Sequence, residues 1–262
     1  MEYFDTHMHL DDEKFDEDRN QVIQKIWNAG VTKCIDIGCD IKSSKKAIEL
    51  ANKNDFIYAS CGIHPENLPN QNPQKMDELW KELEIIKELA IKNTKVVAIG
   101  EIGLDYHWVQ TNKETQKIIF KKQIELANEL NLPISIHTRD AIDDTIKIIK
   151  ENKIQKSGVL HCCPFNPELV RHGLEAGLYI AFGGTSTFKS SKNVSKIVEM
   201  VPIQKMLIET DAPYLAPEPV RGTRNDSSNL KYVVQKLAEF KNITSEQMAK
   251  ITYQNAEKLF IK

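Results

Sequence analysis

His7 and His9 lie two residues apart near the amino terminus, directly after a short hydrophobic segment. In an extended strand alternate side chains face the same way, so both imidazoles would project from one face and Met8 from the other. Neutral imidazoles are common ligands of divalent metal ions. The pair therefore indicates part of a metal site, which later segments would have to complete.

Imidazoles and carboxylates recur where later hydrophobic runs end. Each has an ordinary explanation on its own, such as a loop cap, a turn or a solvated side chain. Gathered at one place they would repel one another or lose hydration unless cations were present. The residues are His64, Glu101, His137, His161, Glu209 and Asp211.

The elements that must position these residues alternate along the chain. Eight short runs, mostly of continuous hydrophobic residues, are typical of parallel strands that are covered on both faces. We predict strands at 2–5, 33–37, 56–60, 95–99, 133–136, 157–160, 178–182 and 205–209. Amphipathic stretches between them predict helices at 18–29, 42–53, 74–92, 113–131, 140–152, 166–176 and 191–200.

Local signals support the helices. Phe120, Ile124 and Ala127 form a stripe that would face the core. Two further helices are expected to close the chain, and Thr244 with Gln247 would form a capping box at the start of the second.

Eight strand–helix units predict a (β/α)₈ TIM barrel, as a single domain over residues 1–262. A doubly wound open sheet is the alternative. The polar residues favour the barrel, because a closed barrel brings the carboxyl ends of all its strands to one rim.

Six of the candidate residues are expected to bind metal: His7, His9, Glu101, His137, His161 and Asp211. They are too many for one tetrahedral ion and suit two divalent ions that share Glu101. We expect magnesium or manganese in activity, with zinc, nickel or iron also retained by the histidine-rich shell. The residual positive charge of such a centre favours an anionic substrate such as a phosphodiester.

Composition limits the partners. With 35 basic and 37 acidic residues the net charge is −2, which argues against general coating of nucleic acid but allows a local basic patch. Five cysteines without a CxxC pair indicate reduced thiols. With neither a signal peptide nor a long apolar span in sight, we expect a cytoplasmic protein without a membrane or an obligate protein partner.

Basic and aromatic residues follow the same strands as the candidate ligands. A run of charges is usually a solvated face, but the shared placement favours contact with a nucleic-acid backbone, with Arg139 and Arg221 as the substrate-binding candidates. The others are Lys189, Lys192 and Arg224, together with Tyr106, Trp108, Phe165 and Tyr214, of which one or two would stack an unpaired base.

Several motifs together resemble the TatD-type metal-dependent deoxyribonucleases, which belong to the amidohydrolase-like TIM barrels. They are HMHL at 7–10, GIHP at 62–65, GEIGLDY at 100–106, His137-Thr138-Arg139, Gly158 to His161, and ETDAPYLAP at 209–217, in family order from residue 3 to about residue 260. The resemblance implies a cytosolic hydrolase that acts on DNA, often as a 3′-to-5′ exonuclease on single strands or 3′ ends, with water activated between two metal ions.

By position, the resemblance implies that His7, His9, Glu101 and Asp211 bind one ion, and that Glu101, His137 and His161 bind the other. His64 would lie near the substrate phosphate, and Glu209 and Asp211 near the attacking water. Two segments depart from the family on rim loops and bear on substrate preference: Cys162-Cys163-Pro164-Phe165 stands for the usual Cys-Phe-Ser-Gly, and Asn225-Asp226-Ser227-Ser228 for Asn-Glu-Pro.

Some alternatives remain open from the sequence. The same site would hydrolyse other esters or amides, for example as a D-aminoacyl-tRNA deacylase. A protein that only binds metal and nucleic acid is disfavoured by the full ligand set, and a Cys162 nucleophile by the lack of a paired histidine and carboxylate. His64 would hold a phosphate or turn the chain. Glu209 would support a ligand histidine or take part in proton transfer, and Asp105 would begin a helix or bind metal.

Overall fold

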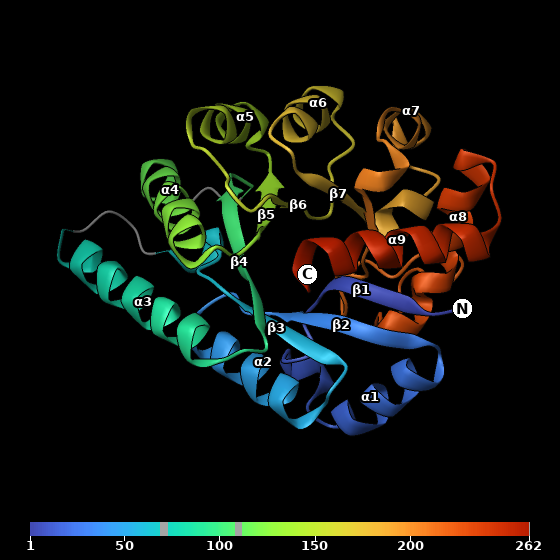
Figure 1. The fold of residues 1–262 in the computed structure, drawn as a ribbon, viewed down its shortest axis with the longest axis horizontal. Helices are drawn as coiled ribbons and strands as arrows, with labels where there is room; N and C mark the ends of the chain where they lie inside the picture. The colour runs from blue at the N-terminus through green and yellow to red at the C-terminus, as the bar shows by residue number, and fades with distance from the viewer. Residues whose placement is uncertain (69–72, 108–111, 262) are drawn as a thin grey trace.

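The structure is a computed structural model that describes residues 1–68, 73–107 and 112–261. Parallel strands form one sheet in which each strand pairs with the next along the chain (Figure 1). This arrangement confirms the predicted (β/α)₈ barrel. The strands are β1 (Tyr3–Met8), β2 (Val31–Ile37), β3 (Ile57–Cys61), β4 (Val96–Asp105), β5 (Ile134–Arg139), β6 (Gly158–Leu160), β7 (Tyr179–Phe182) and β8 (Met206–Ile208).

Helices surround the strands, and those predicted between strands begin and end within 3 residues of the expected positions. The predicted capping box of Thr244 and Gln247 is present at the last helix. Within the described residues, none of the helices is both long and apolar enough to span a lipid bilayer. The helices are α1 (Arg19–Asn28), α2 (Ile41–Lys53), α3 (Pro73–Lys92), α4 (Lys113–Leu130), α5 (Ile142–Glu151), α6 (Pro167–Glu175), α7 (Val194–Met200), α8 (Leu230–Lys241) and α9 (Ser245–Phe260).

Strand β4 is longer than its hydrophobic run predicted. The prediction ended at residue 99, because Gly100 and Glu101 interrupt the apolar pattern. Pairing with β5 nevertheless continues through Gly103 to Asp105. Gly103 has a φ of +141°, and a Cβ there would lie 2.0 Å from the carbonyl oxygen of His137, so only glycine allows this approach. Glu101 therefore stands within a strand and not in a loop.

The barrel interior is apolar at the amino-terminal ends of the strands. Side chains from seven of the strands form one cluster there with the last turns of α9. Strands on opposite sides of a barrel can share a cluster only across its interior, so these residues fill the barrel and α9 covers this end. The members include Phe4, Ile35, Val97, Val159, Tyr179, Leu207, Leu259 and Phe260.

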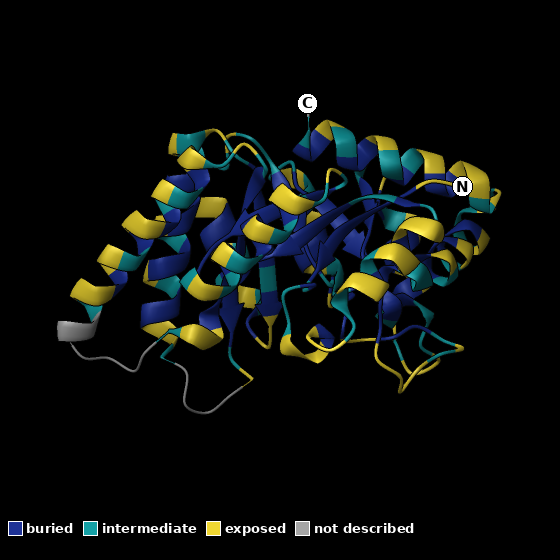
Figure 2. Ribbon diagram, turned by 90° about the horizontal axis from the view of Figure 1, so that it is seen from below, coloured by how far each residue is buried: buried dark blue, intermediate teal, exposed yellow. Residues whose placement is uncertain are grey.

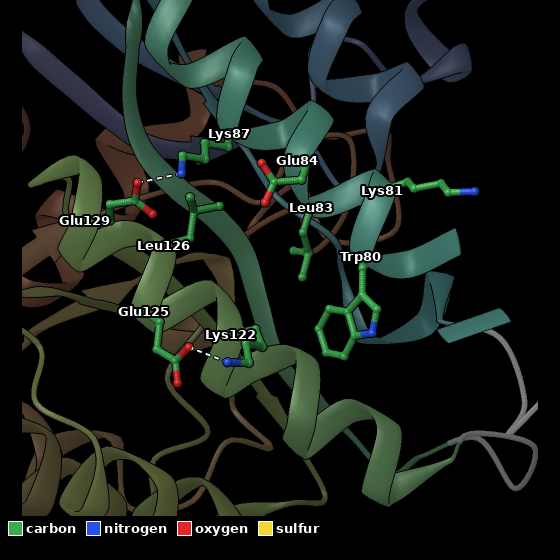
Figure 3. A pocket seen from close by; sticks show the side chains of 9 residues that line it. All are labelled: Trp80, Lys81, Leu83, Glu84, Lys87, Lys122, Glu125, Leu126 and Glu129. Atoms are coloured by element: carbon green, nitrogen blue, oxygen red, sulfur yellow. Dashed lines mark hydrogen bonds and ion pairs between the residues drawn. The ribbon is translucent and has the colours of Figure 1, made fainter. Parts of the chain in front are cut away.

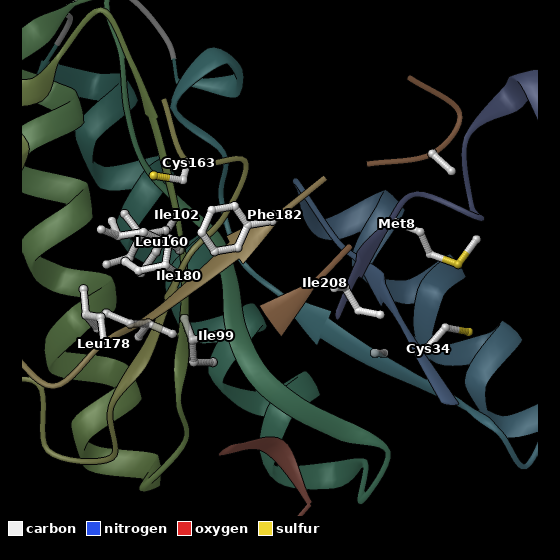
Figure 4. Close-up of a cluster of buried hydrophobic side chains, with 14 of the residues drawn as sticks. Met8, Cys34, Ile99, Ile102, Leu160, Cys163, Leu178, Ile180, Phe182 and Ile208 are labelled. Atoms are coloured by element: carbon white, nitrogen blue, oxygen red, sulfur yellow. The ribbon is translucent and has the colours of Figure 1, made fainter. Parts of the chain in front are cut away.

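A second, larger cluster lies between the strands and the surrounding helices. Figure 4 shows part of it, with Ile99, Leu160, Ile180 and Phe182 close together. Phe120, Ile124 and Ala127 of α4 are buried in it, as their spacing predicted. Figure 2 shows the result: the strands are buried and the helices expose one face to solvent. The polar interior is thus left to the carboxyl ends of the strands.

The chain after β8 pairs with β1 and closes the barrel at this polar end. The Asp211 amide donates to the His7 carbonyl (2.9 Å), and the His9 amide donates to the Ala212 carbonyl (2.7 Å). The buried Asp5 carboxylate reinforces this junction, because it accepts from the Thr210 amide (3.0 Å) and the Thr210 hydroxyl (2.6 Å). Closure therefore places His7, His9 and Asp211 side by side.

Replacing Asp5 with alanine tests this junction. The Asp5→Ala variant leaves buried donors of Thr210 without an acceptor, so we expect the free energy of unfolding to fall by about 3 kcal/mol in urea denaturation. Asp55 is exposed, and Asp55→Ala should change stability by less than about 0.5 kcal/mol. Equal effects of the two substitutions would contradict the role of Asp5.

Candidate metal centre

A polar cavity of about 500 Å³ opens at the carboxyl ends of the strands. A second depression, of about 520 Å³, lies on the outside of the barrel between α3 and α4 (Figure 3). The outer depression is lined by Trp80, Leu83 and Leu126 and by lysine–glutamate pairs such as Lys122–Glu125. Volume does not distinguish the two. Only the cavity gathers imidazoles and carboxylates that face one another, which makes it the candidate site.

Four donor atoms converge on one side of Glu101. His7 Nε2 lies 3.3 Å from His9 Nε2, 3.4 Å from Glu101 Oε2 and 3.7 Å from Asp211 Oδ1. His9 Nε2 lies 3.6 Å from Glu101 Oε2 and 3.4 Å from Asp211 Oδ1. Ligands bound tetrahedrally at about 2.0–2.2 Å from an ion are separated by about 3.3–3.6 Å. The spacing of these four atoms is therefore that of a metal site.

The other oxygen of Glu101 faces a second group of imidazoles. Glu101 Oε1 lies 2.8 Å from His137 Nδ1, 3.2 Å from His161 Nε2 and 3.5 Å from His64 Nε2. The carboxylate is buried, with 3% of its residue surface exposed. One carboxylate thus stands between two donor groups, which is the arrangement of a bridging ligand.

The outer nitrogens of the histidines determine which nitrogen faces the cavity with a lone pair. His9 Nδ1 lies 3.1 Å from the carbonyl oxygen of Ile37, an acceptor. His137 Nε2 lies 2.9 Å from Asp105 Oδ2, and His161 Nδ1 lies 3.2 Å from Glu209 Oε1. Each outer nitrogen therefore carries the hydrogen, and the inner nitrogen presents its lone pair. This arrangement is the one that a metal ligand requires.

Inner lone pairs that face carboxylate oxygens need a cation between them. In the protein without metal a proton takes that place. Burial alone lowers the pKa of His137, but hydrogen bonds to Asp105 and Glu101 raise it to about 9. Burial favours neutral Glu101, yet the charges of His64, His161 and His7 lower its pKa well below the usual value. The donor set therefore fits divalent metal ions, which would displace these protons.

His64 differs from the other imidazoles. It precedes the short turn Pro65–Asn67, and its Nδ1 accepts a hydrogen bond from the Glu66 amide (3.2 Å). The neutral ring must then carry its hydrogen on Nε2, the nitrogen that faces Glu101. A donor at this position is suited to an oxygen of the substrate. His64 thus both turns the chain and points into the cavity.

Glu209 and Asp105 lie behind ligand candidates. Glu209 is fully buried, and its Oε1 accepts from the Cys162 amide (2.6 Å) as well as facing His161. Asp105 holds the outer side of His137 and accepts from the His107 amide (2.9 Å). Of the roles left open by the sequence, the geometry favours support of a histidine for both residues.

The basic and aromatic candidates are placed unevenly. Arg139 lines the cavity. Arg221 lies over the Phe188 ring at 4.2 Å, and Arg224 instead binds Asp18. Of the aromatic candidates, Trp108 lies outside the described residues, Phe165 is buried and Tyr106 donates to Asp144, whereas Tyr214 lines the cavity.

Two residues after β2 were missed at the sequence level. Asp36 is buried at the end of the strand and accepts from the Leu10 amide (2.7 Å), which holds the chain beyond His9. Cys39 lines the cavity, and its Sγ lies 3.7 Å from Glu101 Oε2. Burial raises the pKa of this thiol to about 12. Their position at a strand end was the available signal, but neither residue continued the histidine–carboxylate pattern.

We expect metal affinity to increase with pH, because bound ions must displace protons from the imidazoles. Below the His137 pKa of about 9, affinity should rise by up to about tenfold per pH unit for each proton released. Titration of the metal-free protein with Zn²⁺ at several pH values between 6 and 8 measures this slope. Affinity independent of pH would contradict the proposed displacement.

Comparison with known proteins places the fold and site in a family. A model described as TatD related DNase matches residues 4–261. The metal-dependent hydrolase YabD of Bacillus subtilis, named as uncharacterized, is 42% identical over 258 residues, covering 98% of both chains. YcfH of Escherichia coli K12, named likewise, is 34% identical over 98% of this chain and 94% of that protein.

The structural comparison agrees with the sequence comparison. The crystal structure of YJJV, a TatD homologue from Escherichia coli K12, superposes with a TM-score of 0.91 at 27% identity. The match covers 98% of this chain and 97% of the other. This chain belongs to the TatD-related DNase family of metal-dependent hydrolases.

Proposed function

We propose that this protein is a deoxyribonuclease that hydrolyses phosphodiester bonds of DNA, as a 3′-to-5′ exonuclease, with two divalent metal ions. The observation that carries the proposal is the placement of Glu101, whose two oxygens each face a separate group of donors. Membership of the TatD-related DNase family supports DNA as the substrate.

His7, His9, Glu101 and Asp211 would hold one ion, and Glu101, His137 and His161 the other. When bound, such ions supply Lewis acidity for a phosphoryl oxygen and lower the pKa of water to produce a nucleophile. Magnesium or manganese would support activity in this proposal, with zinc, nickel or iron as alternative occupants.

Asp211 is the carboxylate best placed to take a proton from the attacking water. Its side chain is 17% exposed, against 4% for Glu101, so it faces the open part of the cavity. Glu209 and Asp105 keep His161 and His137 in the orientation described above. The Nε2–H of His64 would donate to a phosphate oxygen, and Arg139 at the cavity wall would contact the DNA backbone.

The Asp211→Asn variant tests the proton acceptor. We expect the rate of turnover to fall at least about 100-fold, because an amide does not accept the proton. The assay is digestion of end-labelled single-stranded DNA with Mg²⁺ or Mn²⁺, with metal content measured in parallel. Asp143→Asn, an exposed aspartate on the same rim, is the matched control. Unchanged turnover in Asp211→Asn with metal still bound would refute the role.

The substrate class is tested by salt and by a competing substrate. If DNA is bound through its phosphates, affinity for a labelled oligonucleotide should fall steeply between 50 and 200 mM salt, by roughly tenfold or more for a few contacts. A flat response would contradict DNA binding. Preferential hydrolysis of D-aminoacyl-tRNA in parallel assays would replace the nuclease with a deacylase on the same site.

A further inference from the structure

Cys39 is a thiol in the wall of the candidate metal centre. It follows β2, and its Sγ lies 3.7 Å from Glu101 Oε2 and 3.9 Å from His9 Nδ1. Glu101 Oε2 is the oxygen that faces the group formed with His7 and Asp211. The thiol is therefore next to two of the donors of one proposed ion.

The backbone of Cys39 is held independently of any metal. Its amide donates to Ser43 Oγ (2.8 Å), in the first turn of α2. Its carbonyl accepts from the His64 amide (2.8 Å) and from the side-chain amide of Asn67 (2.8 Å). Because these bonds fix the Cα, the sulfur is confined to positions at the cavity wall.

The separation from Glu101 is that of two ligands on one ion. A sulfur bound at about 2.3 Å and an oxygen bound at about 2.0–2.2 Å, at a tetrahedral angle, lie about 3.5–3.7 Å apart. The separation of 3.7 Å between Cys39 Sγ and Glu101 Oε2 matches this value.

Cys39 is the cysteine whose placement allows this role. Cys34, Cys61 and Cys163 are buried in the hydrophobic core, and Cys162 is half-buried beside Glu209 through its amide. Cys39 alone among the five is one of the residues that line the cavity.

We propose that Cys39 is a sulfur ligand of the ion held by His7, His9, Glu101 and Asp211, and that it biases this position toward thiophilic ions such as Zn²⁺. The inference rests on the proposed metal centre. On binding, the S–H bond breaks, the sulfur lone pair forms the bond to the ion, and the proton passes to solvent. No electron is transferred, so no oxidant or reductant is needed.

Sulfur donors favour zinc and cobalt over manganese and magnesium, which prefer oxygen. Loss of the thiol should therefore weaken zinc binding selectively. We expect the Kd for Zn²⁺ to rise at least about tenfold in Cys39→Ser, whereas the Kd for Mn²⁺ changes less than about threefold.

The direct test is absorption spectroscopy of the metal-free full chain loaded with Co²⁺. Wild type should show a thiolate-to-cobalt charge-transfer band in the near ultraviolet, together with the visible bands of bound cobalt. Cys39→Ser should lose the near-ultraviolet band and keep the visible bands, which report that the other ligands remain in place. Cys61→Ser, at a buried position outside the cavity, should keep both.

The outcomes separate this inference from the proposed function. Visible cobalt bands without a charge-transfer band in wild type would overturn sulfur ligation and leave the metal centre standing. A charge-transfer band that survives in Cys39→Ser would also overturn it. Absence of visible cobalt bands from every variant, including wild type, would reject the metal centre and with it both proposals.

Discussion

A single buried carboxylate determines how the polar end of this barrel is built. Glu101 is removed from water, and its charge must be balanced by the groups that surround it. Imidazoles face both of its oxygens, from β1, β3, β5 and β6. Only a closed barrel brings donors from so many strands to one point. The need to balance this charge therefore links the fold to the chemistry.

Closure of the barrel is part of the same problem. The junction between β1 and the chain after β8 is formed by backbone bonds of His7, His9 and Asp211, the residues that face Glu101 on one side. Asp5 strengthens the junction from behind through Thr210. A loss of pairing here would separate the donors, so stability and metal binding depend on the same contacts. The apolar filling by α9 at the opposite end supports both.

Residues that do not face the proposed ions decide what the imidazoles can do. Asp105, Glu209 and the Ile37 carbonyl place the hydrogen on the outer nitrogen of a histidine and leave the inner nitrogen free to bind a metal ion. The Glu66 amide has the opposite effect on His64, which becomes a donor. Histidines of one chemical type thus divide into metal ligands and a substrate contact.

Much of the fold follows from the sequence, because hydrophobic periodicity and strand length are local properties. The alternating units predicted the barrel, and the strand ends predicted which six residues the structure brings together around Glu101. Local patterns failed where pairing overrode composition, as in β4, which continues through two glycines because β5 lies alongside.

Partner choice was decided only by the tertiary structure. The sequence does not reveal that Arg224 is engaged by Asp18, that Glu209 supports His161, or that Cys39 reaches Glu101. These contacts join residues far apart in the chain, and their existence depends on the shape of the closed barrel. The sequence by itself determined which chemical groups are available, and the fold decided which of their atoms meet.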